Sequence, residues 1–195
     1  MNDIIGNVIS STWPMIIVSV VVVSTLRLTY LFKNKEHFVF YKELFYLTMI
    51  IYILALFQIV TKEDIVSWST NNLIPFKEMF RYKIGSRLFI KNVVGNVLLF
   101  MPFGFFTGYF LKSKTLNAPL FLSLITSITI EVVQMLIGRV FDVDDIILNT
   151  LGGVVGYLIY HNLSEISKKL PSFFRSEVFL DIVAIIILLG LLTLI

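Results

Sequence analysis

The sequence predicts an all-α integral membrane protein, a polytopic helical bundle with about six transmembrane helices. The first observation is composition. Of the 195 residues 57% are hydrophobic and 15% are charged, and the mean hydropathy of +0.88 lies well outside the range of soluble domains. The second is that apolar residues gather in runs of about the length that a bilayer requires. Six such runs cover residues 15–32, 44–60, 93–111, 118–137, 146–160 and 178–195.

These runs divide the chain into three parts. Residues 1–60 hold two N-terminal transmembrane helices, and residues 61–160 form a core of an interfacial loop and three transmembrane helices. Residues 161–195 supply a cytoplasmic loop and a C-terminal transmembrane helix. The run 146–160 is the shortest, at roughly 22 Å for 1.5 Å per residue, so it crosses a bilayer only if flanking residues extend the helix.

Composition also limits the chemistry. The net charge of +3 is explained by basic loops near lipid headgroups, so we expect membrane lipids and no nucleic acid as partners. The chain has no cysteine, which excludes disulfides, thiolate metal sites and a cysteine nucleophile. His37 and His161 lie in polar loops beside basic residues, and we interpret them as solvated surface side chains. The oligomeric state is left open.

Loop charges favour one orientation. Lysine and arginine are divided almost equally between the two sets of alternating loops, but they are denser in the short loops 33–43 and 112–117, whereas 142–145 is acidic. Because positive charge concentrates in cytoplasmic loops, we predict that these short basic loops lie in the cytoplasm and that the N-terminus lies outside. Arg27, near the cytoplasmic end of the first run, is expected to extend to the headgroups rather than to pair with an acid.

The connection between the second and third runs differs from a plain linker. Asn72, Pro75 and Phe76 lead into residues 77–82, where aromatic residues alternate with charges. Such a segment can lie in the membrane plane with its apolar side toward the acyl chains. A solvated loop with a short helix is the alternative.

The third run carries polar groups at one end. Asn92 and Asn96 are four residues apart and share a helix face. Pro102 lacks an amide hydrogen and is expected to kink the helix near its centre. Because neighbouring helices must satisfy the carbonyl that a kink frees, we expect this helix inside the bundle.

Ionisable and amide side chains also interrupt the fourth run. Glu131 and Gln134 share one helix face, and Glu131 lies about 9 Å from the outer end of the run. Asn96, Gln134 or Arg139 is the expected partner of its carboxyl group. Such groups are costly inside a membrane and often functional, so we interpret Glu131 and Gln134 as parts of a binding site.

The fifth run continues the polar pattern. Asp142, Asp145 and Asn149 follow at spacings of three and four, which places them on one helix stripe. Structural roles are alternatives here: Asp142 as a helix N-cap, Asn149 in an interhelical hydrogen bond, and Gly152 with Gly156 as a small-xxx-small packing pair.

We predict no metal site and no cofactor. Glu131, Asp142 and Asp145 offer oxygen ligands that suit a hard divalent cation, but no spacing among them is diagnostic. The sequence contains no Gly-rich phosphate loop, Ser-His-Asp set or HExxH motif.

In this order, the polar and glycine residues resemble the VanZ-like family of bacterial membrane proteins. The pattern is an Asn-x-x-Pro-Phe segment, an Asn before a Phe-x-Pro-x-Gly bend, a Glu-x-x-Gln pair and an Asp-x-x-Asp-x-x-x-Asn-x-x-Gly-Gly run. The matching positions are Asn72, Pro75 and Phe76; Asn96, Phe100, Pro102 and Gly104; Glu131 and Gln134; and Asp142, Asp145, Asn149, Gly152 and Gly153. Arg139 and Asp144 fall outside the pattern, and the first apolar run is an addition to it.

The resemblance implies a multi-pass protein of the bacterial cytoplasmic membrane, in a family named for lowered susceptibility to the glycopeptide antibiotic teicoplanin. We expect a binding module whose outward-opening polar pocket takes a lipid-linked cell-wall precursor or a lipoglycopeptide. The expected pocket residues are Asn72, Asn96, Glu131, Gln134, Arg139, Asp142, Asp145 and Asn149. The alternative is a membrane-embedded enzyme acting on a lipid-linked cell-wall intermediate, with Glu131 as general acid or base. Transport ranks last, since no inverted repeat is visible.

Overall fold

The computed structural model describes residues 2–61 and 71–192. Within these ranges the chain forms helices and no β-strand. Five of the described helices are long and apolar enough to cross a membrane, which confirms the all-α polytopic membrane fold. The sixth apolar run forms α8 (Glu177–Leu192), of 16 residues, and its crossing stays a prediction. Residues 193–195 of that run, and residues 62–70 of the expected interfacial loop, lie outside the described ranges.

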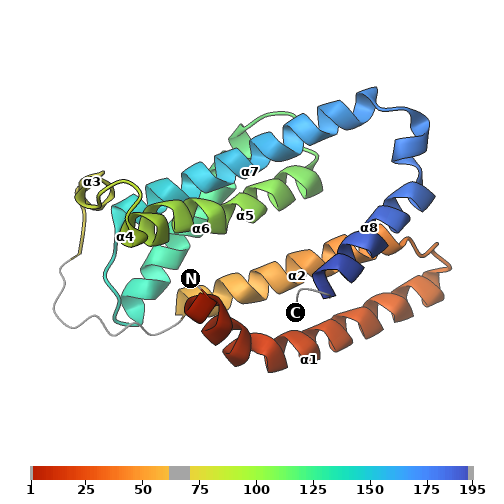
Figure 1. Ribbon diagram of the computed structural model, residues 1–195, viewed down its shortest axis with the longest axis horizontal. Coiled ribbons are helices and arrows are strands. Elements are labelled where there is room, and N and C mark those ends of the chain that lie inside the picture. The colour runs from red at the N-terminus through yellow and green to blue at the C-terminus, as the bar shows by residue number, and fades with distance from the viewer. Residues whose placement is uncertain (1, 62–70, 193–195) are drawn as a thin grey trace. The chain divides into compact units, whose positions relative to one another are not determined.

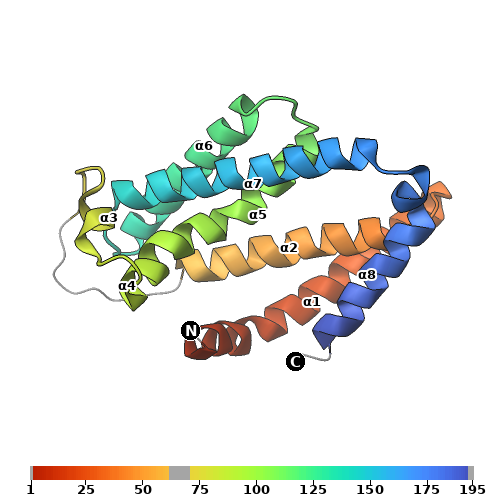
Figure 2. The same ribbon diagram turned by 45° about the horizontal axis from the view of Figure 1, so that its top comes forward.

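The helices form two compact units. Unit 1 consists of residues 1–59 and 166–195, and unit 2 of residues 60–165. In unit 1, α1 (Asn2–Asn34) and α2 (Phe40–Thr61) form an antiparallel hairpin, which is visible in both ribbon views (Figures 1 and 2). The short 3-10 helix η2 (Ser172–Arg175) precedes α8.

Two polar contacts tie α8 to the start of α2. Lys42 Nζ lies 2.9 Å from Glu177 Oε1, and Asp181 Oδ1 accepts the Tyr41 amide at 2.8 Å. Both contacts join the first turn of α2 to the first two turns of α8. The starts of the two helices are therefore held together.

The structure corrects the expectation for Arg27. Its guanidinium donates two hydrogen bonds to Glu43 on α2, Nε to Oε2 at 2.9 Å and Nη2 to Oε1 at 3.1 Å. It also lies over the rings of Tyr30 and Tyr46, at 5.3 and 5.6 Å from their centroids. Arg27 pairs with an acid because the hairpin places Glu43 opposite it, and a planar guanidinium binds a carboxylate in this two-bond geometry.

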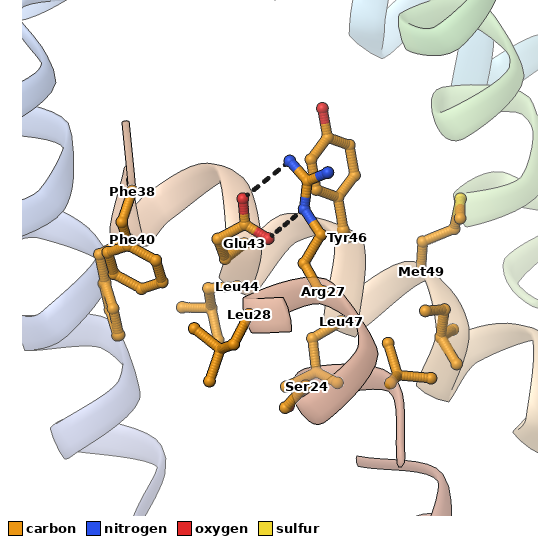
Figure 3. Close-up of a pocket in the computed structure, with 12 residues that line it drawn as sticks. Ser24, Arg27, Leu28, Phe38, Phe40, Glu43, Leu44, Tyr46, Leu47 and Met49 are labelled. Atoms are coloured by element: carbon orange, nitrogen blue, oxygen red, sulfur yellow. Dashed lines mark hydrogen bonds and ion pairs between the residues drawn. The ribbon is translucent and has the colours of Figure 1, made fainter. Parts of the chain in front are cut away.

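Unit 1 contains a cavity of about 520 Å³ between α1 and α2. Figure 3 shows apolar side chains such as Leu28, Leu44 and Leu47 around it, with the Arg27–Glu43 pair at one side. The two helices thus leave space along part of their length instead of packing closely.

Unit 2 is a bundle of three long helices: α5 (Gly95–Leu111), α6 (Asn117–Leu136) and α7 (Val143–Lys169). They lie side by side in both views, and the short helices α3 (Lys77–Arg81) and α4 (Arg87–Phe89) lie at one end of the bundle (Figures 1 and 2). The π-helical turn η1 (Ile90–Val94) joins α4 to α5.

The helix α5 continues through Pro102. The irregular turn of this span is η1, which ends just before Asn96. The kink expected at Pro102 stays a prediction. Phe100, two residues before Pro102, is buried in the core of unit 2, which also contains Phe106, Leu148 and Tyr157.

Glycines let the backbones of unit 2 approach closely. A Cβ added at Gly156 would lie 1.8 Å from Met101 O, and one at Gly152 would lie 2.2 Å from Val97 O, both on α5. From the other side, a Cβ at Gly104 would meet Gly153 O at 1.8 Å. The predicted small-residue packing between Gly152, Gly156 and a neighbouring helix is therefore confirmed.

The helix α6 is polar inside and apolar outside. Its buried residues are Pro119, Ser123, Ser127, Glu131 and Gln134. Its exposed side chains include leucines, isoleucines and valines along its whole length. This arrangement suits a helix with acyl chains on its outer face and hydrogen-bonding helices on its inner face.

Candidate functional site

The segment that begins at Asn72 docks on the chain that leads into α7. Asn72 N donates to Phe141 O at 2.9 Å, and Val143 N donates to Asn72 O at 3.1 Å. This pair of bonds forms the isolated bridge between Asn72 and Asp142. The Asn72 side chain adds a third contact, from Nδ2 to Asp142 Oδ1 at 2.8 Å. The interhelical loops are thus joined at one end of the bundle.

Asp142 caps α7, as its position predicted. The helix begins at Val143, and Asp142 Oδ1 accepts the amide of Asp144 at 2.8 Å, the bond of a helix N-cap. Burial raises the pKa of Asp142 above the ordinary aspartate value, and the hydrogen bond from Asn72 opposes this shift.

Asp144 holds the segment around α3. Its Oδ1 accepts the amide of Phe76, and its Oδ2 accepts the amides of Glu78 and Met79 at 2.7 and 3.1 Å. Phe76 has a φ of 67°, in the left-handed region that phenylalanine seldom adopts. The buried Asp144 carboxylate therefore stabilises a backbone that the sequence would not adopt by itself. From the sequence alone Asp144 had no assigned role, and the structure gives it this one.

Glu131 is buried, and each of its two carboxyl oxygens accepts a hydrogen bond. It is 1% exposed, and its Oε2 accepts the amide of Asp142 at 3.0 Å. With the Gln134 amide oriented to satisfy both neighbours, Gln134 donates to Glu131 Oε1 at 2.9 Å and accepts from Arg139 Nη1 at 2.8 Å. Of the three partners expected for Glu131, Gln134 is the direct one and Arg139 acts through it.

Two further hydrogen bonds join side chains of different helices. Asn96 Nδ2 on α5 donates to Asp145 Oδ1 on α7, and Asn149 Nδ2 on α7 donates to Ser127 Oγ on α6 at 3.0 Å. The buried oxygens Asn149 Oδ1 and Ser123 Oγ have no hydrogen-bond partner. The interhelical role of Asn149 is therefore confirmed, and acceptor capacity remains unused at depth.

All eight residues expected in the pocket lie in unit 2, near the end of the bundle where α7 begins. One connected chain of hydrogen bonds contains Asn72, Asp142, Glu131, Gln134 and Arg139. Asn96 with Asp145, and Asn149 with Ser127, form separate pairs. We call these residues the acid–amide network. Among the motif residues, Gly104, Gly152, Gly153 and Gly156 lie at the close contact of α5 with α7, which we call the glycine seam. Asp144 accepts the amide of Phe76. Pro75, which directly precedes Phe76, is exposed.

The residues of the network differ in exposure. Asn72, Glu131, Gln134 and Asn149 are buried. Asn96, Arg139, Asp142 and Asp145 are half-buried. In residues 2–61 and 71–192 no group of three or more histidine, aspartate or glutamate side chains is placed to hold a metal ion.

Sequence reasoning missed three residues that build the site. Ser123 and Ser127 precede Glu131 at intervals of four, a spacing that puts all three on one helix face. This spacing was a usable signal. Asp144 had none beyond its place in an acidic cluster, because its partners are backbone amides more than 60 residues away.

A bundle of apolar helices around hydrogen-bonded acids and amides defines a polytopic membrane protein with a polar network at one end of its helix bundle. The chain belongs to the VanZ/LLP1 family, whose model matches residues 40–165. It is also 30% identical to Protein VanZ of Enterococcus faecium over 122 residues, which covers 60% of this chain and 68% of that protein. No solved structure matches. The family resemblance seen in the sequence is thereby confirmed, and the matched region contains the whole acid–amide network.

Proposed function

We propose that this protein is an envelope-binding protein that lowers susceptibility to teicoplanin-type glycopeptides. In this proposal the acid–amide network binds a polar group of the glycopeptide or of a lipid-linked cell-wall precursor. The supporting observation is the gathering of amides and carboxyl groups from three helices at one end of unit 2, some of them buried and others half-buried. The 30% identity to Protein VanZ supports the same function.

The chemistry of the network narrows the group that it would bind. It contains the carboxyl groups of Glu131, Asp142 and Asp145 against one guanidinium, and Asn149 Oδ1 lacks a donor. Such an excess of acceptors favours ligand groups with N–H or O–H donors, such as amines, amides and hydroxyls. It disfavours phosphate, which would meet like charges. We therefore propose the peptide or sugar part of the ligand, and not a diphosphate, as the group bound there.

The enzymatic alternative has less support. A general acid or base must reach its substrate within hydrogen-bonding distance. Both oxygens of Glu131 already accept hydrogen bonds, and the side chain is 1% exposed. Glu131 is better suited to orient Asp142 and Gln134 than to exchange protons with a ligand.

The test compares carboxyl groups inside and outside the network. Glu131→Gln and Asp145→Asn should restore teicoplanin susceptibility in a host that expresses the protein, and should lower the affinity of purified protein for dansylated teicoplanin by roughly tenfold or more. Glu177→Gln, a matched change at an exposed ion pair in unit 1, should change neither. Normal susceptibility and binding in both network variants, at equal protein levels, would sink the proposal.

We also propose that the network opens to the outside of the cytoplasmic membrane, with the N-terminus outside. Because the chain has no cysteine, single cysteines report topology without background. A membrane-impermeant maleimide should label Ser69→Cys, three residues before Asn72 in the sequence, in intact cells, and should label Ser113→Cys only after lysis. The reverse labelling would invert the proposed orientation.

A further inference from the structure

The segment of residues 72–91, which we call the rim segment, is held where two candidate membrane spans begin. One span starts at Arg87 and the other at Val143. Asp144 accepts three amides of the rim segment, and Asn72 bonds to both Phe141 and Asp142. If α5 and α7 cross the bilayer, the rim segment is fixed at the level of the headgroups, because it cannot move away from the start of either helix.

The rim segment carries exposed apolar and exposed basic side chains together. Phe80 is 85% exposed and Ile84 is 83% exposed. The exposed basic residues are Lys77, Arg81, Lys83, Arg87 and Lys91. The only acid among residues 72–91 is Glu78, which pairs with Arg81 at 3.1 Å. The segment therefore has a net positive charge of four beside exposed aromatic and aliphatic groups.

We propose that the rim segment is a binding surface for the anionic phospholipids of the membrane, with Phe80 and Ile84 in the acyl boundary and the basic side chains on the headgroup phosphates. Exposed apolar groups beside lysine and arginine fit the two layers of a membrane interface. The positive charge selects anionic over zwitterionic headgroups. A free phosphate would satisfy the charge but would leave Phe80 and Ile84 in water, so the lipid surface is the partner that fits both.

This inference is independent of what the acid–amide network binds. It concerns the opposite chemistry, because the network is rich in acceptors whereas the rim is rich in cations. The hydrogen bonds of Asp144 hold the rim segment at the start of α7, beside the acid–amide network. Lipid bound at the rim would then fix the segment that covers the start of α7.

A tryptophan reporter tests the proposal. Trp13 and Trp68 are the two tryptophans of the chain, so the triple variant Trp13→Phe, Trp68→Phe, Phe80→Trp carries one reporter in the rim. The variant is reconstituted in vesicles that contain either brominated phosphatidylglycerol or brominated phosphatidylcholine, and quenching gives the relative affinity for each lipid. We expect several-fold preferential quenching by the anionic lipid, and a fall in this preference at high salt.

Charge variants on the same background identify the source of the preference. Adding Lys77→Gln, Arg81→Gln and Lys83→Gln should lower it at least about fivefold, roughly the contribution of one basic residue at an anionic surface. Lys112→Gln with Lys114→Gln, in the exposed loop between α5 and α6, should leave it unchanged. Equal quenching by the two lipids, absence of quenching by either, or a preference that resists both salt and the rim substitutions would overturn the proposal. Circular dichroism in the same vesicles checks that each variant is folded.

Discussion

Unit 1 and unit 2 are both built from apolar helices, yet their helices meet in opposite ways. In unit 1, α1 and α2 are separated over part of their length by a cavity of about 520 Å³, and the Arg27–Glu43 pair connects them at one side. In unit 2, the glycine seam brings the backbones of α5 and α7 into contact, and hydrogen-bonded polar side chains are buried beside an apolar core. The comparison indicates that unit 2 is the part of the chain in which geometry is tightly specified.

The physical reason lies in the bilayer. Acyl chains are as apolar as leucine, so burial of apolar surface does not by itself hold membrane helices together. Close backbone contact and interhelical hydrogen bonds supply the association instead. Unit 2 has both, and the family match, residues 40–165, covers all of it. The helix α1 of unit 1 lies outside that match.

The largest loss of stability is expected when one methyl group is added at the glycine seam. The Cβ of Gly156→Ala would lie 1.8 Å from Met101 O and 2.9 Å from Phe105 N, both backbone atoms of α5. We expect a loss of about 3 kcal/mol in the free energy of unfolding, measured by titration with sodium dodecyl sulfate in mixed micelles and followed by circular dichroism. Gly95→Ala, whose nearest contact is 3.5 Å away, is the control and should stay within about 0.5 kcal/mol. Equal stability of the two variants would contradict close backbone contact between α5 and α7 at Gly156.

A smaller loss is expected when Asp144 is neutralised. Asn in place of Asp144 offers one acceptor oxygen to three backbone amides, so Asp144→Asn should cost about 2 kcal/mol. It should also speed tryptic cleavage after Lys77, Arg81 and Lys83, because the segment around α3 would detach. Asp181→Asn in unit 1, where the carboxylate accepts the single amide of Tyr41, should cost less. Unchanged cleavage of Asp144→Asn would show that the carboxylate does not hold this segment.

Two serines on one helix sharpen the comparison within unit 2. Ser127→Ala removes the acceptor of Asn149 Nδ2 and should cost about 1 kcal/mol. Ser123→Ala removes a buried hydroxyl that has no partner, so it should be neutral or slightly stabilising. The same micelle titration measures both. An equal cost for the two would mean that the hydrogen bond to Asn149 contributes nothing specific.

The smallest effect is expected in unit 1, at the cavity. Ser24 lines this space on α1 (Figure 3), so Ser24→Val adds apolar volume where room exists. We expect the free energy of unfolding to change by no more than about 0.5 kcal/mol, in contrast to the single methyl of Gly156→Ala. A loss as large as that at Gly156 would show that α1 and α2 are packed as tightly as α5 and α7.

The sequence by itself determined the membrane class, because hydropathy is a sum over residues and needs no tertiary contact. It also determined the family and the glycine seam, since Gly152 and Gly156 have the spacing of a helix face. The capping role of Asp142 followed from its position directly before a helix. These features are local in the chain, and local spacing carries them.

The tertiary structure alone decided which polar groups meet. Arg27 pairs with Glu43 because a hairpin brings two helices together, and Asp144 holds amides that are distant along the chain. Gln134 became the direct partner of Glu131, whereas Asn96 bonds to Asp145. A hydrogen bond depends on distance and direction within a few tenths of an ångström. Sequence spacing restricts side chains to a helix face, but only the packing of helices fixes which atoms on two faces come within reach.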